Sequence, residues 1–338
     1  MFFLLNKILR KIKINIVFLN KIFLLEKKIN KIKKKKIIFF SNLVYFNNYY
    51  NNYNRIIYYS KYIKNYKFIL IPIINLNCKI DKIISSIKST LLDKIYCLLE
   101  KSLEIFIIKI QQLNFFYEEI TIPLFINYSN LLYSGQIPKF YNNLFKIEKI
   151  NSFLIPTSEV ILNCLSFFIK NNFLPIKLIC NSYCFRKEIG NLCKNNLGIK
   201  RQQQFKKIEI FQFFKKNESF ERFYSICSNI IYILKLLEIK FRIIKLNSYE
   251  LNLNSFLTFD FEIWSYIDNS WIEISSLSLC LNKSFNIFLK KKNIYLINAS
   301  CLPLGRLIYI IFYTFRISNC FIKIPKKINK ILTDLLKW

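Results

Sequence analysis

Polar side chains recur at fixed spacing within segments of the sequence that are otherwise apolar. Four pairs are separated by two or four residues: Thr157 and Glu159, Arg186 and Glu188, Phe205 and Glu209, and Glu273 and Ser275. Side chains two or four positions apart on a β-strand share a face, and a buried charge is costly unless it has a partner. We therefore expect one sheet face to form a polar cleft in which acidic and basic groups alternate.

One such pair alone would be typical of an ordinary solvent-facing side of a sheet. Two observations favour a binding site instead. The pairs are repeated, and all the glycines of this chain stand next to polar clusters: Gly135, Gly190, Gly198 and Gly305.

Missing residue types restrict the chemistry that the cleft can perform. The chain has no histidine, which excludes a Ser–His–Asp triad, a Cys–His pair and acid–base catalysis by histidine. Its 10 cysteines include no C-x-x-C pair, so we expect reduced core thiols in a cytoplasmic protein rather than a zinc site. An enzyme built from this chain must act through positioning and electrostatics, or through carboxylates.

The polar pairs lie on segments whose patterns predict a mixed fold. Apolar residues three and four apart predict a long helix over 83–116 and further helices over 158–170, 219–239 and after Gly305. Strand patterns occupy 175–188, 201–214, 257–267 and 270–279, and a short strand-like run ends at Pro123. Strands adjacent in sequence favour an α+β fold in which helices flank an antiparallel sheet.

Residues 1–75 differ from the rest because they contain lysine runs and an Asn/Tyr tract. We interpret them as a short, basic, helical N-terminal arm that precedes a domain over 76–338. The formal net charge is +32, which suggests a polyanionic partner such as nucleic acid, although AT-rich codon usage contributes to it. No stretch approaches the ~20 apolar residues that a membrane span needs, so we expect no membrane association.

Five segments, taken in order, resemble seryl-tRNA synthetase, a class II aminoacyl-tRNA synthetase family. "SGQIPKF" (134–140) resembles G-Q-L-P-K-F, and "LIPTSEV" (154–160) resembles L-I-P-T-A-E-V. "CFRKEIG" followed by "GIKRQQQFKKIEI" resembles the family's motif 2, "EISSLSLC" resembles E-I-S-S-x-S-N-C, and "NASCLPLGR" resembles motif 3. The resemblance runs from about Tyr96 to Pro325 and implies the antiparallel sheet of class II synthetases.

The resemblance also implies roles for individual residues. Arg186 bridges the amino acid carboxylate and the α-phosphate of ATP, Phe205 stacks on adenine, and Arg306 clamps the far phosphate. Glu273 holds Mg²⁺. The remaining ATP-binding positions are Lys187, Glu188, Gln202, Gln203, Gln204, Ile274, Ser275 and Ser276. The serine-binding positions are Thr157, Ser158, Glu159, Arg186, Glu209, Asn298 and Ser300.

The implied reaction fits the absence of histidine. The serine carboxylate is ionised at neutral pH and attacks ATP without a general base, while arginines and magnesium stabilise the departing pyrophosphate. The resemblance implies L-serine, ATP and tRNA(Ser) as substrates. It also implies a homodimer, because residues 83–123 resemble the motif 1 helix and strand that form the family's two-fold interface.

The chain departs from the family pattern at several positions. Ala299 and Cys301 replace motif 3 glycines, which could alter close backbone approach to serine, and Gln203 replaces a histidine. The other departures are Asn195, Leu197, Asn286 and Ile287. The arm over 1–75, which we interpret as a tRNA-binding element, is also shorter than the family's coiled coil.

Three alternatives to a serine–tRNA ligase stay open. The chain could make seryl-adenylate for another carrier, or it could be a non-catalytic basic RNA-binding protein. It could also be a class II enzyme for threonine or proline, but the "TSE" and "NASC" segments favour serine.

Overall fold

A computed structural model describes residues 54–60, 68–72, 85, 88–92, 94–169, 173–189, 198–252, 255–266, 268–280, 294–315 and 321–336. Chain contacts divide the protein between Tyr49 and Tyr50. All the described residues belong to the second of these units. Most of the predicted N-terminal arm therefore lies outside the described residues, as do the departures at Asn195, Leu197, Asn286 and Ile287.

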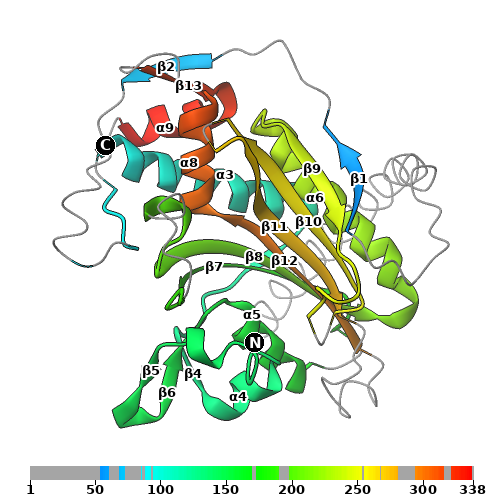
Figure 1. Ribbon diagram of the computed structural model, residues 1–338. Coiled ribbons are helices and arrows are strands. Elements are labelled where there is room, and N and C mark those ends of the chain that lie inside the picture. Colours follow the sequence, from blue (N-terminus) through cyan, green and yellow to red (C-terminus); the bar gives the residue numbers. More distant parts are fainter. Residues whose placement is uncertain are drawn as a thin grey trace, which may run out of the picture. The chain divides into compact units, whose positions relative to one another are not determined.

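An eight-stranded sheet forms the centre of the described unit (Figure 1), with strand order β1-β9-β10-β11-β12-β8-β7-β3. Neighbouring strands pair antiparallel except β3, which pairs parallel to β7. This confirms the predicted α+β class with a large antiparallel sheet. The strands are β1 (Arg55–Tyr59), β3 (Glu118–Glu119), β7 (Ile176–Phe185), β8 (Gln204–Lys215), β9 (Phe241–Lys245), β10 (Leu257–Ser265), β11 (Ser270–Cys280) and β12 (Ile294–Pro303).

The sheet has one apolar and one polar face because its strands alternate residue types. In β10, the buried Phe259, Phe261 and Ile263 alternate with Asp260 and Glu262, which are more accessible. Successive side chains of a strand point to opposite faces. The apolar set therefore faces the packed helices, and the carboxylates lie on the other face.

Four longer helices accompany the sheet: α3 (Lys94–Phe115), α6 (Ser219–Leu236), α8 (Leu304–Thr314) and α9 (Lys326–Leu336). Helices α3, α6 and α8 pack against strands of the large sheet, and α3 also packs against α6, α8 and α9. No helix among the described residues is long and apolar enough to span a membrane. The described cysteines carry free thiols, and Cys180, Cys184, Cys227, Cys280 and Cys301 are buried.

Two predicted helices are shorter in the structure than in the sequence pattern. The helix predicted over 83–116 begins at Lys94, because residues before it make tertiary contacts; the Lys88 carbonyl, for example, accepts a 2.9 Å hydrogen bond from the Gln203 N–H. The helix predicted over 158–170 is α5 (Glu159–Cys164), which continues as the 3₁₀ turn η3 (Leu165–Phe167).

A small three-stranded sheet supports one wall of the site. It contains β4 (Phe125–Asn127), β5 (Lys146–Ile147) and β6 (Ser152–Leu154), in the order β4-β6-β5. Together with α4 (Tyr128–Tyr133) and α5 it encloses a core of its own, which includes Ile126, Leu131, Leu144, Phe153, Ile155 and Val160. The segment Thr157–Glu159 follows β6 directly, so this core fixes its position.

Two strands of the predicted arm pair with strands from later in the chain. β1 pairs with β9, and β2 (Phe68–Pro72) pairs with β13 (Phe321–Pro325). The domain boundary at residues 75 and 76 stays a prediction, and these pairings give residues 55–59 and 68–72 a place beside the strands of the remaining chain.

Candidate functional site

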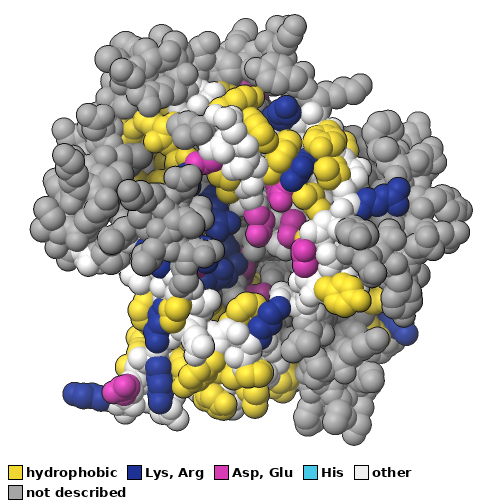
Figure 2. All heavy atoms as spheres, in the orientation of Figure 1, with side chains coloured by type: hydrophobic (Ala, Val, Ile, Leu, Met, Phe, Trp, Pro, Cys, Tyr) yellow, Lys and Arg dark blue, Asp and Glu magenta, His cyan; other side chains and the backbone are white. Residues whose placement is uncertain are grey.

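A hollow of about 620 Å³, its open mouth included, lies where β7, β8, β11 and β12 meet the start of α8. Figure 2 shows acidic side chains gathered in a hollowed face, with Lys and Arg side chains beside them. Eight predicted site residues line the hollow: Arg186, Glu188, Gln202, Phe205, Glu273, Ile274, Ser300 and Arg306. Residues from distant parts of the sequence therefore meet at one cleft, as the spacing of the polar pairs predicts.

Arg186 is held in a fixed orientation just beyond the end of β7. Its Nε donates a 3.0 Å hydrogen bond to the Pro156 carbonyl, and its guanidinium lies 5.4 Å from the centre of the Phe205 ring. The backbone N–H of Arg186 donates to the Gln203 carbonyl at 2.8 Å. A guanidinium held in this way is preorganised for bidentate binding of a carboxylate or phosphate.

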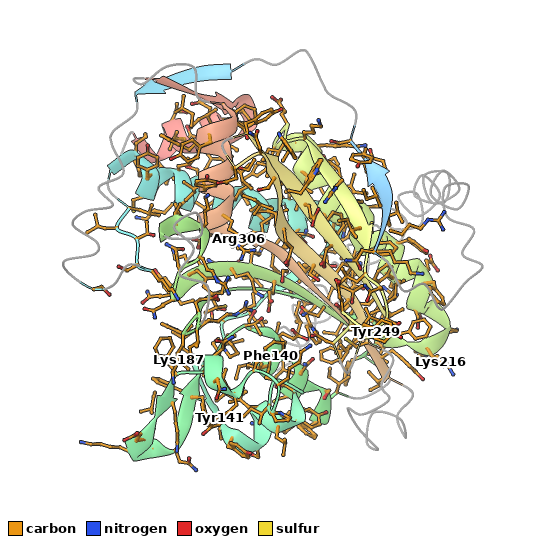
Figure 3. The ribbon with its side chains drawn as sticks, in the orientation of Figure 1. Phe140, Tyr141, Lys187, Lys216, Tyr249 and Arg306 are labelled. Carbon is orange, nitrogen blue, oxygen red and sulfur yellow. The ribbon has the colours of Figure 1, made fainter. Side chains whose placement is uncertain are left out.

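Arg306 lies on the first turn of α8 (Figure 3). Its Nε donates to the Lys200 carbonyl at 3.1 Å and its Nη1 to the Glu273 carbonyl at 3.0 Å. Burial lowers the pKa of Arg306, while the Glu273 carboxylate opposes that shift. The preceding Gly305 lies close to its neighbours: a Cβ there would stand 2.6 Å from Oε1 of Gln202, whose flexible side chain would have to move, and 3.3 Å from the Ile199 carbonyl oxygen.

Glu188 is nearly fully buried and adopts a φ of 53°, a left-handed conformation that is uncommon for a residue with a side chain. Its carboxylate forms an ion pair with Nε of Arg201, and its carbonyl accepts a hydrogen bond from Nζ of Lys88. Such backbone conformations cluster at functional sites. Arg201 lines the hollow as well, although the sequence analysis does not assign it a role.

A cluster of buried polar side chains adjoins the hollow and includes the predicted serine-binding residues Thr157, Ser158 and Glu209. Glu209 is fully buried and accepts hydrogen bonds from Thr157 at 2.7 Å and from Ser158 at 2.5 Å. Lys207 forms an ion pair with Glu209. Burial opposes ionisation of Glu209, but the Lys207 charge and the hydrogen bonds outweigh it, so the pKa of Glu209 is lowered.

Lys207 connects the hollow to the buried polar cluster, and it is not among the residues predicted from the sequence. Its Nζ contacts Thr157 Oγ1 at 3.0 Å and Ser300 Oγ at 3.2 Å, and its side chain also lines the hollow. Phe205, Lys207 and Glu209 stand two apart on β8, so the strand alternation used for the polar pairs could have identified the lysine.

Glu159 is the first residue of α5 and lies beside this cluster. Burial raises its pKa to about 7, the Glu209 carboxylate adds to that shift, and Lys207 and Arg186 oppose it. Two carboxyl groups close together, one ionised and one titrating near neutrality, suit the binding of a cation.

Strand β12 carries Asn298 and Ser300 toward the site and the two unusual motif 3 residues away from it. Ala299 and Cys301 are fully buried, and Sγ of Cys301 accepts a hydrogen bond from Gln111 of α3 at 3.6 Å. Their side chains therefore belong to the core between sheet and helices. The altered approach to serine that the sequence suggests does not follow from their side chains.

The neighbouring strand β11 braces β12. Ser275 is buried, and its hydroxyl donates to the Ser300 carbonyl. The expectation that Glu273 and Ser275 share a face is wrong, because a bulge pairs Ser275 with Phe261 and Glu273 with Glu262, which point to opposite faces. Ser276 stands opposite Asp260 in the sheet, and burial, with a contribution from Glu273, raises the pKa of Asp260 to about 7. Asp260 is a further carboxyl near Glu273 that the sequence analysis missed, and its alternation with Phe259 and Phe261 is the signal that could have found it.

Five predicted ATP-binding residues do not line the hollow: Lys187, Gln203, Gln204, Ser275 and Ser276. Gln203 holds the loop together: its Nε2 donates to the Lys187 carbonyl at 3.2 Å. The Lys187 N–H donates to the Asn143 carbonyl at 2.9 Å, and Figure 3 shows Lys187 near the small sheet, away from Arg306. Gln204 is exposed at the start of β8.

A known family matches the part of the chain that contains this site. The family described as "tRNA synthetase class II core domain (G, H, P, S and T)" matches residues 144–315, about half of the chain. The serine–tRNA ligase of Finegoldia magna is 31% identical over 242 residues, which cover 69% of this chain and 58% of that protein. The serine–tRNA ligase of Prochlorococcus marinus (strain MIT 9215) is 36% identical over 221 residues, which cover 62% and 51%. The chain thus spans little more than half the length of these relatives.

Solved structures share the fold. Seryl-tRNA synthetase from Pyrococcus horikoshii, complexed with ATP, superposes with a TM-score of 0.70 at 22% identity, covering 76% of this chain and 60% of that one. Cytoplasmic serine–tRNA ligase from Naegleria fowleri, in complex with AMP, gives 0.68 at 22% identity, with 75% and 62% covered. On its sequence match and its fold, this chain belongs to the class II aminoacyl-tRNA synthetases, and its named relatives are serine–tRNA ligases.

Proposed function

We propose that this protein is a serine–tRNA ligase, which activates L-serine with ATP and transfers the serine to the 3′ end of tRNA(Ser). One observation carries the proposal. Lys207 joins a hollow lined by Arg186 and Arg306 to a buried cluster of Glu209, Thr157 and Ser158. The hollow suits the phosphates of ATP, and the buried polar cluster suits a small amino acid with an ammonium and a hydroxyl group.

Phosphate binding is assigned to the two arginines. Arg186 lies between the hollow and the buried polar cluster, where its guanidinium can contact the serine carboxylate and the α-phosphate together. Arg306, fixed by two backbone carbonyls, binds the far phosphate. Phe205 offers its ring to adenine on the side that Arg186 does not cover, because base–aromatic stacking needs only a free ring face.

Serine binding is assigned to the buried polar cluster and the residues beside it. The carboxylates of Glu209 and Glu159 attract the serine ammonium group, and Thr157, Ser158 and Ser300 supply hydroxyls for polar contacts. A pocket that hydrogen-bonds a hydroxyl rejects the analogue that lacks it, because buried polar groups are then left unpaired.

A magnesium ion fits the oxygen donors near the phosphate end of the hollow. Glu273 has an exposed carboxylate there, and the Ser276 hydroxyl and Asp260 stand close by in the sheet. Oxygen ligands are those that magnesium prefers. Glu273 would hold the ion, which when bound supplies positive charge against the phosphates.

The residues present suffice for the chemistry without a general base. An oxygen of the serine carboxylate attacks the α-phosphorus, and the bond to pyrophosphate breaks with its electron pair leaving on pyrophosphate. Arg186 and Arg306 stabilise this charge through preorganised donors. A ribose hydroxyl at the 3′ end of tRNA then attacks the seryl carbonyl, and AMP leaves.

Assembly and location are proposed on the same basis. We place the enzyme in the cytoplasm as a homodimer whose interface includes α3 and β3, the elements that correspond to the predicted motif 1 segment. Light scattering of the full chain tests the dimer, and a monomer at working concentrations would contradict it.

A second candidate is a protein that makes seryl-adenylate and charges a carrier other than tRNA. The residues assigned to adenylate formation suit this candidate equally, because they act before any carrier is charged. A protein that binds RNA without catalysis is a further one, which the arginines of the site argue against.

Charging of tRNA separates these candidates. Labelled serine is incubated with the full chain, ATP and either tRNA(Ser) or a non-cognate tRNA. A serine–tRNA ligase makes the labelled serine acid-precipitable when tRNA(Ser) is present and does not do so with the non-cognate tRNA. Formation of seryl-adenylate without any charged tRNA would support the second candidate and contradict the first.

A further inference from the structure

An ion pair outside the predicted site residues lies at the wall of the hollow. Nζ of Lys200 stands 2.5 Å from Oδ1 of Asp268, and the side chains of both residues are mostly buried, at 16% and 17% exposure. Lys200 ends the 3₁₀ turn η6 (Gly198–Lys200) and lines the hollow. Asp268 lies in the connection between β10 and β11.

The Asp268 carboxylate collects further donors. Its Oδ2 accepts hydrogen bonds from Ser265 at 2.7 Å and from the Tyr309 hydroxyl at 3.0 Å. Nζ of Lys200 also lies 4.6 Å from the centre of the Tyr309 ring. Three donors and a lysine–ring contact therefore converge where η6, the β10–β11 connection and helix α8 meet.

This cluster is coupled to Arg306 through the backbone. The two carbonyls that fix the Arg306 guanidinium belong to Lys200 and Glu273. The Lys200–Asp268 pair joins η6, which carries the first carbonyl, to the hairpin whose second strand carries the other. Tyr309 stands three residues after Arg306, on the same side of α8, and anchors the helix to the same carboxylate.

An ordinary surface ion pair would be the simplest alternative. Exposed pairs contribute little to stability, with a median of about 0–1 kcal/mol. The low exposure of both side chains and the three donors around one carboxylate distinguish this cluster. Although burial disfavours ionisation, the hydrogen bonds from Lys200, Ser265 and Tyr309 lower the pKa of Asp268, so the carboxylate stays charged at neutral pH.

We propose that Lys200, Asp268 and Tyr309 form a positioning network that orients Arg306 toward the terminal phosphate of a bound nucleoside triphosphate. The inference rests on the proposed ATP-dependent function of the hollow and adds residues that act on ATP through Arg306. Among the described residues, the hydrogen bonds of Asp268 and Tyr309 involve Lys200, Ser265 and each other, and no proposed serine-binding residue. Its loss therefore weakens the binding of ATP and leaves the binding of serine unchanged.

The test compares nucleotide affinities of the full chain by titration calorimetry. Asp268→Asn keeps the shape and one acceptor oxygen but removes the charge, and Lys200→Met removes the ammonium group while keeping the apolar stem. Lys200→Arg restores a cation. Glu218→Gln is the matched control, because it removes a pair of similar geometry, Glu218–Arg222 at 2.5 Å, which does not line the hollow.

We expect Asp268→Asn and Lys200→Met each to raise the Kd for ATP about tenfold, since misplacement of a positioned group by about 1 Å has effects of that order or larger. The Kd for AMP, which lacks the terminal phosphate, should change less than twofold. The double variant should be no weaker than the single variants, and Lys200→Arg should recover most of the affinity. Glu218→Gln should bind both nucleotides like the unaltered chain.

Three results would overturn the network. They are an unchanged Kd for ATP in both single variants, equal weakening of ATP and AMP, and full additivity in the double variant. If the unaltered chain binds no ATP, the network and the proposed function both fail. If it binds ATP with the expected pattern but supports no serine-dependent exchange of pyrophosphate, only the proposed serine activity fails.

Discussion

Single residues divide the candidate site into a cationic and an acidic part. Arg186 and Arg306 stand in the open hollow, whereas Glu209 is fully buried and shares its carboxylate with Thr157, Ser158 and Lys207. Lys207 contacts both parts. This division matches a reaction that brings two anionic groups together while it holds an ammonium group apart from them.

Arg186 carries the largest expected single effect. Arg186→Ala should lower the rate of serine-dependent pyrophosphate exchange by about 100-fold or more, because one preorganised donor to a developing charge is typically worth ~3 kcal/mol. The exchange rate and the melting temperature check this. Arg222→Ala, which removes a guanidinium that does not line the hollow, should leave the rate unchanged. Near-normal exchange in Arg186→Ala would refute the assignment.

Glu159 should make serine binding depend on pH. Its pKa is raised from 4.5 to about 7, so the carboxyl group is neutral below pH 7 and ionised above it. The KM for serine should therefore fall roughly tenfold between pH 6 and pH 8, as the fraction ionised rises. In Glu159→Gln the KM should be high and independent of pH across this window.

Thermal unfolding supplies the control for that variant. A carboxyl group with a raised pKa holds more protons in the folded state, so stability falls as pH rises from 4.5 to about 7. Glu159→Gln removes this loss and should unfold at a temperature no lower than the unaltered chain at pH 8. A normal KM for serine in a stable Glu159→Gln protein would contradict the role of Glu159.

At the scale of elements, strand alternation and helix packing hold the site in place. Helix α3 buries Leu103 completely but leaves Leu113 73% exposed. Leu103→Ala should lower the free energy of unfolding by ~2–5 kcal/mol, because it leaves a cavity in a close-packed core. Leu113→Ala, on the same helix, should change it by less than about 0.5 kcal/mol. Equal effects in denaturant titrations would contradict this description of the helix.

The sequence patterns predict the strands of the site better than its helix ends. Alternation in 201–214 puts Phe205 and Glu209 on one face of β8, because a period of two is decided locally. In 270–279 the alternation fails, because a bulge in β11 turns Ser275 to the face of Phe261 and Glu273 to the face of Glu262. The apolar spacing predicts a start of α3 that is too early, because a tertiary hydrogen bond between Gln203 and Lys88 competes with local helix propensity. Asp268 could not be paired with Lys200 from the sequence, because only folding brings the β10–β11 connection to η6.

At the scale of the whole molecule, the chain combines a described class II core with an N-terminal segment rich in lysine. The compact unit that holds the site begins at Tyr50. It includes β1 and β2, which pair with β9 and β13. A truncation that tests the N-terminal segment should therefore keep residues from Tyr50 onward.

A chain that begins at Tyr50 should keep serine-dependent exchange but lose most tRNA charging. The loss should appear as weaker binding of tRNA and as a shallower dependence on salt, because lysine contacts to phosphates contribute affinity that salt screens. Binding titrations of both chains at several salt concentrations measure this. An unchanged salt slope would assign tRNA binding to the remaining chain.

The central claim is that the site couples ATP to serine. Exchange of labelled pyrophosphate into ATP by the full chain, with serine or alanine as the amino acid, tests it most directly. We expect exchange with serine and a rate at least ~10²-fold lower with alanine, because the missing hydroxyl leaves buried polar groups unpaired. Equal exchange with the two amino acids, or none with serine, would contradict the account.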